Sequence, residues 1–175
     1  MADGPFDPET GELIPRPPVE EDLVDLCRKL NALGARFVVV GGFAVIMAGY
    51  PRTTGDVDLL IDASRENEAK VFEALATLPD GCVRELNPGD VAKYLVVRVA
   101  DEILVDLMAS ASGIDYAEAL PGVVIHEIEG VPIPFAGPEL LWKMKVRAGR
   151  EKDRGDIDFL RHWFAARGIE PPEVT

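Results

Sequence analysis

Apolar residues recur three or four positions apart between Leu23 and Leu33, close to the start of the chain. The acidic run EED stands before this stretch, and Gly34 stands after it. Acidic side chains favour the positive end of a helix dipole, and glycine is a common C-terminal cap. The pattern predicts a first helix from Val19 to about Gly34.

Short β-branched and apolar runs alternate with further helical patterns. The runs predict strands at 36–40, 56–61, 93–99, 102–108, 123–128 and 131–135. The helical patterns predict a short helix after Gly41-Gly42 and others at 65–78, 116–120, 137–147 and from about 153. Proline cannot donate to a strand ladder, so Pro132 and Pro134 predict that the last strand lies at a sheet edge. This order of elements predicts a single α+β domain.

Composition bounds the organisation and location of the protein. Of 175 residues, 47% are apolar, enough for one core. We expect a flexible N-terminal arm at 1–18, a domain at 19–168 and a C-terminal tail at 169–175. The formal charge of −13 argues against a surface that coats nucleic acid or an anionic membrane. Two cysteines and no apparent signal or membrane-spanning segment predict a cytoplasmic protein that does not bind membranes.

The triplet Asp56-Val57-Asp58 opens a predicted strand. Side chains two positions apart on a strand point to the same face, so the two carboxylates lie close together. Their mutual repulsion favours a cation between them, and Mg²⁺ (or Mn²⁺) prefers oxygen ligands that it shares with phosphates. Two solvated aspartates at a strand end are the alternative interpretation.

A third carboxylate, Asp106, lies in the apolar run ILVDLM, where an unpaired charge is costly to bury. If its strand neighbours that of Asp56 and Asp58, three carboxylates converge and can hold two metal ions for phosphoryl chemistry. The alternative is a buried salt bridge from Asp106 to Arg52 or Arg98.

The Gly41-Gly42 pair stands between a predicted strand and a predicted helix. Backbone amides at such a junction can bind phosphate oxygens. A Gly-Gly pair is also found in tight turns that bind no ligand, which is the alternative interpretation. Arg52, Thr53 and Thr54 precede the carboxylates and either orient them, contact a phosphate or shape a loop.

Six basic residues crowd a segment near the C-terminus of this acidic chain: Lys143, Lys145, Arg147, Arg150, Lys152 and Arg154. Such a local positive field suits a triphosphate or the end of a nucleic acid, and a solvated face paired with acidic neighbours is the alternative. Asp156 and Asp158 repeat the Asp-x-Asp spelling inside a predicted helix. There they point some 200° apart and cannot share one ion, so we leave them out of the site.

The Gly41-Gly42 turn, the Asp56-Val57-Asp58 triplet and Asp106 together resemble the signature of the DNA polymerase β-like nucleotidyltransferase superfamily. More narrowly, GGFAVIMAGYPRTTGDVDLLID and PELLWKMKVRAGREKDRGDIDFL resemble the small AbiEii-type nucleotidyltransferases of toxin–antitoxin systems. The resemblance implies a mixed β-sheet flanked by helices. It also implies transfer of a nucleoside monophosphate from an NTP with Mg²⁺ to a hydroxyl of RNA, protein or a small molecule, and an antitoxin as partner.

The resemblance also assigns roles to residues of this chain. Asp56 and Asp58 correspond to metal-binding catalytic residues, and Asp106 to a metal ligand or general base. The resemblance gives phosphate contacts to Gly41 and Gly42, and Lys143 and Lys152 resemble recurrent lysines that suit the same task. Two alternatives stay open: an inactive nucleotide-sensing or partner-binding module of the same fold, and a structural domain whose acids form ion pairs.

Overall fold

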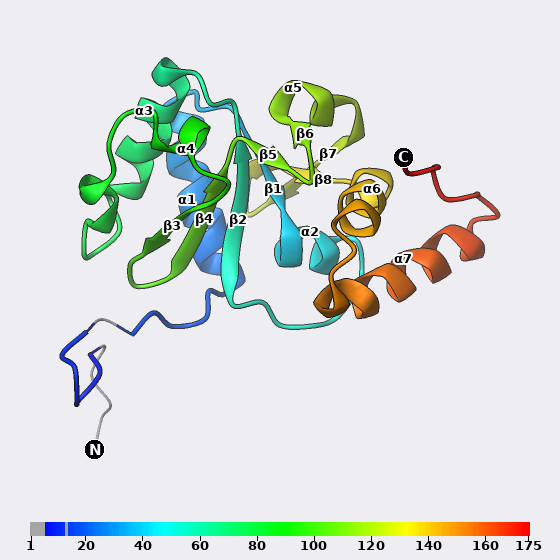
Figure 1. The fold of residues 1–175 in the computed structure, drawn as a ribbon, viewed down its shortest axis with the longest axis horizontal. Helices are drawn as coiled ribbons and strands as arrows, with labels where there is room; N and C mark the ends of the chain where they lie inside the picture. Colours follow the sequence, from blue (N-terminus) through cyan, green and yellow to red (C-terminus); the bar gives the residue numbers. More distant parts are fainter. Residues whose placement is uncertain (1–5, 13) are drawn as a thin grey trace.

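Six strands form one mixed sheet in a computed structural model that describes residues 6–12 and 14–175. The strand order is β3-β4-β2-β1-β8-β7 (Figure 1). The pairs β2–β4 and β1–β8 are parallel and the other pairs are antiparallel. The strands are β1 (Phe37–Val40), β2 (Asp56–Ile61), β3 (Val97–Ala100), β4 (Leu104–Met108), β7 (Val123–Ile128) and β8 (Val131–Ala136).

Helices flank this sheet, which confirms the predicted α+β class. Two of them, α1 (Glu20–Ala32) and α3 (Arg65–Leu75), pack together. On the side with the main cavity, α2 (Gly41–Met47) packs against α6 (Pro138–Ala148), and α6 packs against α7 (Arg154–Ala166). The smaller elements are η1 (Cys82–Glu85), α4 (Asp90–Lys93), β5 (Ser110–Ala111), β6 (Ile114–Asp115), α5 (Tyr116–Ala119), η2 (Leu120–Gly122) and η3 (Glu151–Asp153).

The core lies between the central strands and the helices. All four residues of β1 are buried, as an interior strand requires. In β2 the burial alternates at first, with Val57 and Leu59 buried while Asp56 and Asp58 are half-buried. One face of β2 therefore supplies core packing and the other carries the acidic side chains.

The register of the central strands sets the place of those acids. Asp58 lies opposite Val40, the last residue of β1, on one side and opposite Asp106 of β4 on the other. Because β2 and β4 run parallel in this register, the third acid is brought beside the first two across a long crossover in the sequence.

The strand predicted at 93–99 begins later than expected. Residues Asp90–Lys93 form α4, and β3 starts at Val97. The buried carboxylate of Glu68 accepts hydrogen bonds from the backbone N–H groups of Gly89 at 2.6 Å and Val91 at 3.1 Å, which holds the start of α4. The helical turn that this contact starts includes Lys93, the first residue of the predicted strand, and residues 94–96 then connect it to β3.

The predicted hairpin itself is present, as β3 pairs antiparallel with β4. Its turn contains no glycine, and Asp101 stabilises it instead. The buried Asp101 carboxylate accepts hydrogen bonds from the backbone N–H groups of Asp80 and Cys82, each at 3.0 Å, and of Glu102 at 2.8 Å. A side chain therefore replaces the usual turn chemistry.

The prediction that the proline-containing strand lies at an edge is wrong. This strand, β8, lies between β1 and β7, and β7 is the edge strand. β1 meets β8 at Val39 and Phe135, so Pro132 and Pro134 fall outside that short pairing. The Asn31 side chain donates to the Pro132 carbonyl at 2.8 Å. The prolines are tolerated because the short pairing with β1 does not need their missing N–H groups, while on the other side β8 keeps its pairing with β7, where Pro132 lies opposite Glu127 and Pro134 opposite Ile125.

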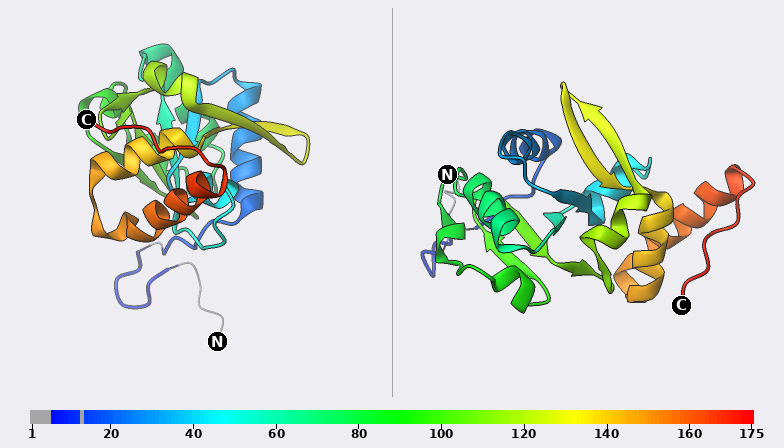
Figure 2. Two further views of the ribbon diagram at one scale, coloured as in Figure 1. Left: turned by 90° about the vertical axis from the view of Figure 1, so that its right-hand side faces the viewer. Right: turned by 90° about the horizontal axis from the view of Figure 1, so that it is seen from above.

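The predicted N-terminal arm and C-terminal tail stay predictions as domain boundaries. Residues 1–5 and 13 of the arm lie outside the described residues, and Arg16 pairs with Asp22 and Glu102. In the tail, the Pro172 carbonyl accepts a hydrogen bond from Trp142 of α6 at 3.0 Å, and Figure 2 shows the tail running back along that helix. Within the described part of the chain, no helix combines the length and apolarity that a membrane span requires.

Candidate active site

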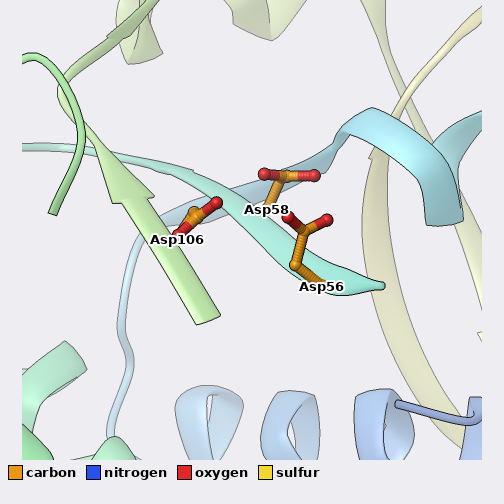
Figure 3. A group of neighbouring side chains, drawn as sticks. All are labelled: Asp56, Asp58 and Asp106. Atoms are coloured by element: carbon orange, nitrogen blue, oxygen red, sulfur yellow. The ribbon is translucent and has the colours of Figure 1, made fainter. Parts of the chain in front are cut away.

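Three carboxylates converge at the centre of the sheet (Figure 3). Asp56 and Asp58 project from one face of β2, and Asp106 projects toward them from β4. One oxygen from each residue lies within 4.8 Å of the other two. The convergence predicted for these three acids is therefore present in the structure, and we call them the acid triad.

Arg98 of β3 contacts the acid triad directly. Its Nε and Nη2 atoms each donate to the Asp106 carboxylate at 2.8 Å, and Nη2 also donates to Asp56 at 3.2 Å. The salt bridge considered as an alternative for Asp106 thus exists together with the convergence. One guanidinium neutralises at most one of three carboxylates, so the acid triad keeps an excess of negative charge.

The crowded negative charge raises the pKa values of two carboxylates of the acid triad, Asp56 and Asp58. Burial, together with the neighbouring carboxylates of Asp56 and Asp106, raises the pKa of Asp58 to about 7, against the opposing effect of Lys145. Burial and the Asp106 carboxylate also raise the pKa of Asp56, against the opposing effect of Arg98 and Lys152. The acid triad therefore favours bound protons or a cation.

Glycine at positions 41 and 42 allows the chain to pass close to the acid triad. Gly41 has a φ of 67°, and a Cβ atom there would collide with the Asp58 carboxylate. A Cβ atom on Gly42 would collide with the side chain of Thr54, whose hydroxyl donates to the Asp56 carbonyl at 3.2 Å. Both glycines line the cavity, so a ligand can approach the backbone there.

The acid triad lies in a cavity of about 720 Å³. Other predicted site residues line the same cavity, namely Gly41, Gly42, Arg52, Thr54 and Lys152. A volume in this range is typical of small-molecule sites in proteins.

Lys143 lies elsewhere, exposed on α6 and not among the residues that line the cavity. The cavity-facing positions of α6 are Leu141, Met144, Lys145 and Ala148. Residues two apart on a helix point some 200° apart, so the face that carries Lys145 excludes Lys143. The structure thus places Lys145 and Lys152 where the sequence analysis expected Lys143 and Lys152.

A second group of charges lines another part of the cavity, and we call it the ionic cluster. Its anions are Asp153 and Asp156, and its cations are Arg52, Lys145 and Arg150. The buried Lys145 amine lies 2.8 Å from Asp153 and 2.9 Å from Asp156. Arg52 donates to both Asp156 oxygens at 2.8 and 3.0 Å, and Arg150 donates to Asp153 at 2.7 Å.

The proton affinity of the ionic cluster contrasts with that of the acid triad. Although burial raises the pKa of Asp153, hydrogen bonds from Lys145 and Arg150 outweigh it and lower the pKa below its usual value. Arg52, expected near the catalytic carboxylates or a phosphate, is held by Asp156. This cluster therefore links the loop before β2 to α6 and α7.

Sequence reasoning missed several lining residues: Tyr50, Leu95, Val96, Asp153 and Asp156. Lys145 and Arg150 were named as members of the basic segment but were not singled out for the site. Asp156 was set aside because it diverges from Asp158, and that divergence is confirmed, since Asp156 is buried and Asp158 is exposed. Yet Asp156 shares its helical stripe with the buried Leu160 and Phe164. The available signal was a carboxylate on the same helix face as apolar residues, comparable to Asp106 within its apolar run.

A mixed sheet that presents three carboxylates beside a glycine-lined cavity is the architecture of the nucleotidyltransferases, the enzyme class indicated by the sequence motifs. The chain belongs to the family described as "Nucleotidyl transferase of unknown function (DUF2204)", whose model matches residues 19–170. This result confirms the predicted superfamily. The closer resemblance to AbiEii-type proteins stays a prediction.

A solved structure shows the same fold. It is a protein of Thermotoga maritima assigned to the nucleotidyltransferases, with 17% sequence identity and a TM-score of 0.51. The similarity covers 86% of this chain and 97% of the other. A comparison with curated proteins finds no match.

Proposed function

We propose that this protein is a Mg²⁺-dependent nucleotidyltransferase that moves a nucleoside monophosphate from an NTP to a hydroxyl acceptor. The convergence of Asp56, Asp58 and Asp106 within 4.8 Å carries the proposal. The family supports the enzyme class, and the residues that line the cavity suit a nucleotide with its metal ion.

The acid triad fits a divalent metal ion. It offers three hard oxygen donors, and Arg98 balances no more than one of their charges. Asp56, Asp58 and Asp106 would hold Mg²⁺ or Mn²⁺, and the ion would supply charge neutralisation at the phosphates. A Cβ atom on Gly41 would occupy space at the Asp58 carboxylate, so glycine at this position keeps the acid triad accessible.

The proposed reaction is a displacement at the α-phosphorus of the NTP. The acceptor oxygen forms a bond to this phosphorus, and the bond to the oxygen that bridges the α- and β-phosphates breaks. Pyrophosphate leaves with the electron pair of that bond, and the hydroxyl proton passes to a carboxylate of the acid triad. The reaction thus brings pyrophosphate, the transferred nucleoside monophosphate and the carboxylate that accepts the proton together in one cavity.

Cationic and backbone groups around the acid triad suit the triphosphate. Lys152 lines the cavity, and its charge lowers the proton affinity of Asp56, so it lies within electrostatic reach of the metal ligands. Gly41 and Gly42 line the cavity beside Asp58 and bring their backbone close to the acid triad. We assign phosphate contacts to Lys152 and to this glycine turn, with Arg52 and Thr54 positioning the loop between them.

Label transfer tests the enzymatic function. Wild-type protein is incubated with Mg²⁺, each labelled NTP and separate pools of RNA, protein and small-molecule acceptors. We expect transfer in one pool and a loss of at least about 100-fold in Asp106→Asn. Calorimetry of NTP binding to the same variant shows whether the nucleotide site persists. Transfer that survives in Asp106→Asn contradicts the assignment of Asp106.

One observation favours the nucleotide-sensing alternative. Arg98 already satisfies both oxygens of Asp106, as in a structural ion pair. In that case, NTP and metal bind to the wild type while no acceptor pool becomes labelled with any of the four NTPs. That outcome assigns the protein to the sensing or partner-binding class.

The finer parts of the proposal concern acceptor and biological role. We take RNA as the acceptor, because Arg150 and Arg154 of the basic segment line a second surface pocket together with Arg161. Each of these arginines also pairs with an acidic neighbour, the arrangement expected of a solvated face, so an RNA phosphate would have to compete with Asp153, Glu151 and Asp158. The AbiEii-type motifs support a cytoplasmic toxin with a protein antitoxin. Growth arrest on expression, relieved by the product of a neighbouring gene, is the expected result, and growth unaffected by expression contradicts it.

A further inference from the structure

Three consecutive apolar side chains are exposed between α4 and β3, at the edge of the sheet. They are Tyr94, Leu95 and Val96, which we call the 94–96 segment, and Leu95 is 82% exposed. Large apolar side chains that gather on a surface commonly mark a contact site. Leu95 and Val96 also line the main cavity, so this segment borders the candidate active site.

The 94–96 segment lies on one side of the acid triad. Val96 directly precedes β3, and Arg98, the second residue of β3, lines the same cavity as Val96. Arg98 in turn contacts Asp106 and Asp56. The apolar wall of the cavity is therefore directly next to the metal ligands.

On the opposite wall, cations outnumber anions: the wall carries Arg52, Lys145, Arg150 and Lys152 against Asp153 and Asp156, and we call it the cationic wall. Arg150 and Lys152 line the cavity from the connection between α6 and α7. In Figure 1, β3 and the α6–α7 pair lie on opposite sides of β2, which carries Asp56 and Asp58. The cavity thus has an apolar wall, a central group of carboxylates and a cationic wall.

We infer that the 94–96 segment holds the nucleobase of the NTP, an assignment that rests on the proposed function. A nucleotide with bound metal has an apolar base at one end and a triphosphate at the other. This polarity matches the two walls: the triphosphate lies toward Lys152, the metal is at the acid triad, and the base contacts Leu95 and Val96.

Other apolar groups of the cavity are less suited to the base. Tyr50 stacks on Phe159 of α7 with ring centroids 5.1 Å apart and planes inclined by 15°. Met108, Leu141 and Met144 are buried. Leu95 and Val96 are thus the exposed apolar contact that the described lining residues offer.

This assignment has a consequence for specificity. Leucine and valine side chains carry no hydrogen-bond donor or acceptor, so they cannot distinguish the edges of the four bases. Strong discrimination requires polar groups that are left unpaired by the wrong substrate. We therefore expect ATP, GTP, CTP and UTP to bind with affinities within about threefold of each other.

Calorimetry with five probes tests the assignment on the full chain. The probes are the four NTPs and inorganic tripolyphosphate, each with Mg²⁺. Leu95→Asn keeps the size of the side chain, and Ile125→Asn is the matched control, because Ile125 is 67% exposed on β7 and does not line the cavity. We expect Leu95→Asn to weaken all four NTPs about 3- to 10-fold and to leave tripolyphosphate unchanged. Ile125→Asn changes neither.

Each other result overturns a stated part of the scheme. NTP affinity that is unchanged in Leu95→Asn, or one NTP preferred more than about 30-fold in the wild type, overturns the base assignment and leaves the proposed function intact. If label transfer falls in Leu95→Asn while NTP affinity is unchanged, the 94–96 segment contacts the acceptor, and the base assignment is overturned as well. If neither NTPs nor tripolyphosphate bind, the proposed function itself fails, and the base assignment with it.

Discussion

The acid triad and the ionic cluster occupy the same cavity, yet they differ in charge balance. In the acid triad, Arg98 pairs with Asp56 and Asp106, and Asp58 has no ion-pair partner among the described residues. In the ionic cluster, two carboxylates share Arg52, Lys145 and Arg150. The pKa is raised at Asp58 and lowered at Asp153. The charges of the ionic cluster compensate one another within the chain, whereas the acid triad keeps an excess of negative charge that a bound cation would compensate.

This difference separates two roles that sequence patterns alone do not distinguish. Both groups consist of aspartates placed in apolar surroundings, which is costly without compensation. The ionic cluster is compensated within the chain and fixes α6 and α7 against the loop that precedes β2. The acid triad is compensated in part, and its remaining charge is the feature that a bound metal would complete.

Removal of the central cation of the ionic cluster should have the largest effect on stability. Lys145→Met keeps the apolar stem and leaves Asp153 and Asp156 with less compensation in a buried place. We expect a loss of about 3 kcal/mol, or a fall in Tm of roughly 6–12 °C in thermal unfolding. Lys143→Met, an exposed change on the same helix, is the control. An unchanged Tm in Lys145→Met would mean that the cluster is not a structural element.

Replacement of Asp58 in the acid triad by a neutral residue should stabilise the fold, whereas Lys145→Met should destabilise it. The raised pKa of Asp58, about 7, means that the folded protein binds a proton more tightly than the unfolded chain does. The stability from this group is complete below the unfolded pKa and is lost as pH rises through about 7. We therefore expect that, in EDTA, the free energy of unfolding of Asp58→Asn rises relative to that of the wild type by about 1–3 kcal/mol between pH 5 and pH 8, as measured by denaturant titrations at each pH.

Asp153→Asn gives the matched comparison for Asp58→Asn. The lowered pKa of Asp153 stabilises the fold above its unfolded pKa, and this contribution disappears as pH falls through the lower folded value. Asp153→Asn should accordingly be less stable than the wild type at pH 5 and at pH 8 alike, in denaturant titrations at each pH. If both variants respond to pH in the same way, the contrast between the two groups is not real.

The smallest expected effect concerns Lys152, which lines the cavity. Lys152→Ala should weaken binding of Mg²⁺–NTP about 3- to 10-fold, because a charge-assisted contact to the triphosphate is lost. Lys143→Ala should leave the affinity unchanged, since this residue does not line the cavity. Equal losses in both variants, measured by calorimetry, would show that the lysines act through the general field of the segment rather than by contact.

The acid triad was predictable because each member carries its own local signal. Asp56 and Asp58 follow the strand period, and Asp106 interrupts an apolar run. The sheet order was less accessible, because β1 and β8 pair only at Val39 and Phe135, beyond both prolines, and the sequence does not show how short that pairing is. The lysine that faces the cavity was missed by two positions, which on a helix reverses the direction of a side chain.

The ionic cluster was harder to foresee for a different reason. Its members come from the loop before β2 and from three elements near the C-terminus, and no single window of sequence contains them. The start of α4 likewise depends on Glu68, which is distant in sequence. Local patterns predict elements well, while contacts between remote polar groups require the packed structure.

The register between β2 and β4 also bears on the order of events in folding. Asp58 and Asp106 become neighbours when two parallel strands close across the residues between them, and this kind of long-range pairing is slow to form. A slip of one residue would turn Asp106 to the other face of the sheet. High-affinity metal binding should therefore appear late in refolding, together with protection of the β4 amides from hydrogen exchange, and a bound ion would report that the central strands have closed in register.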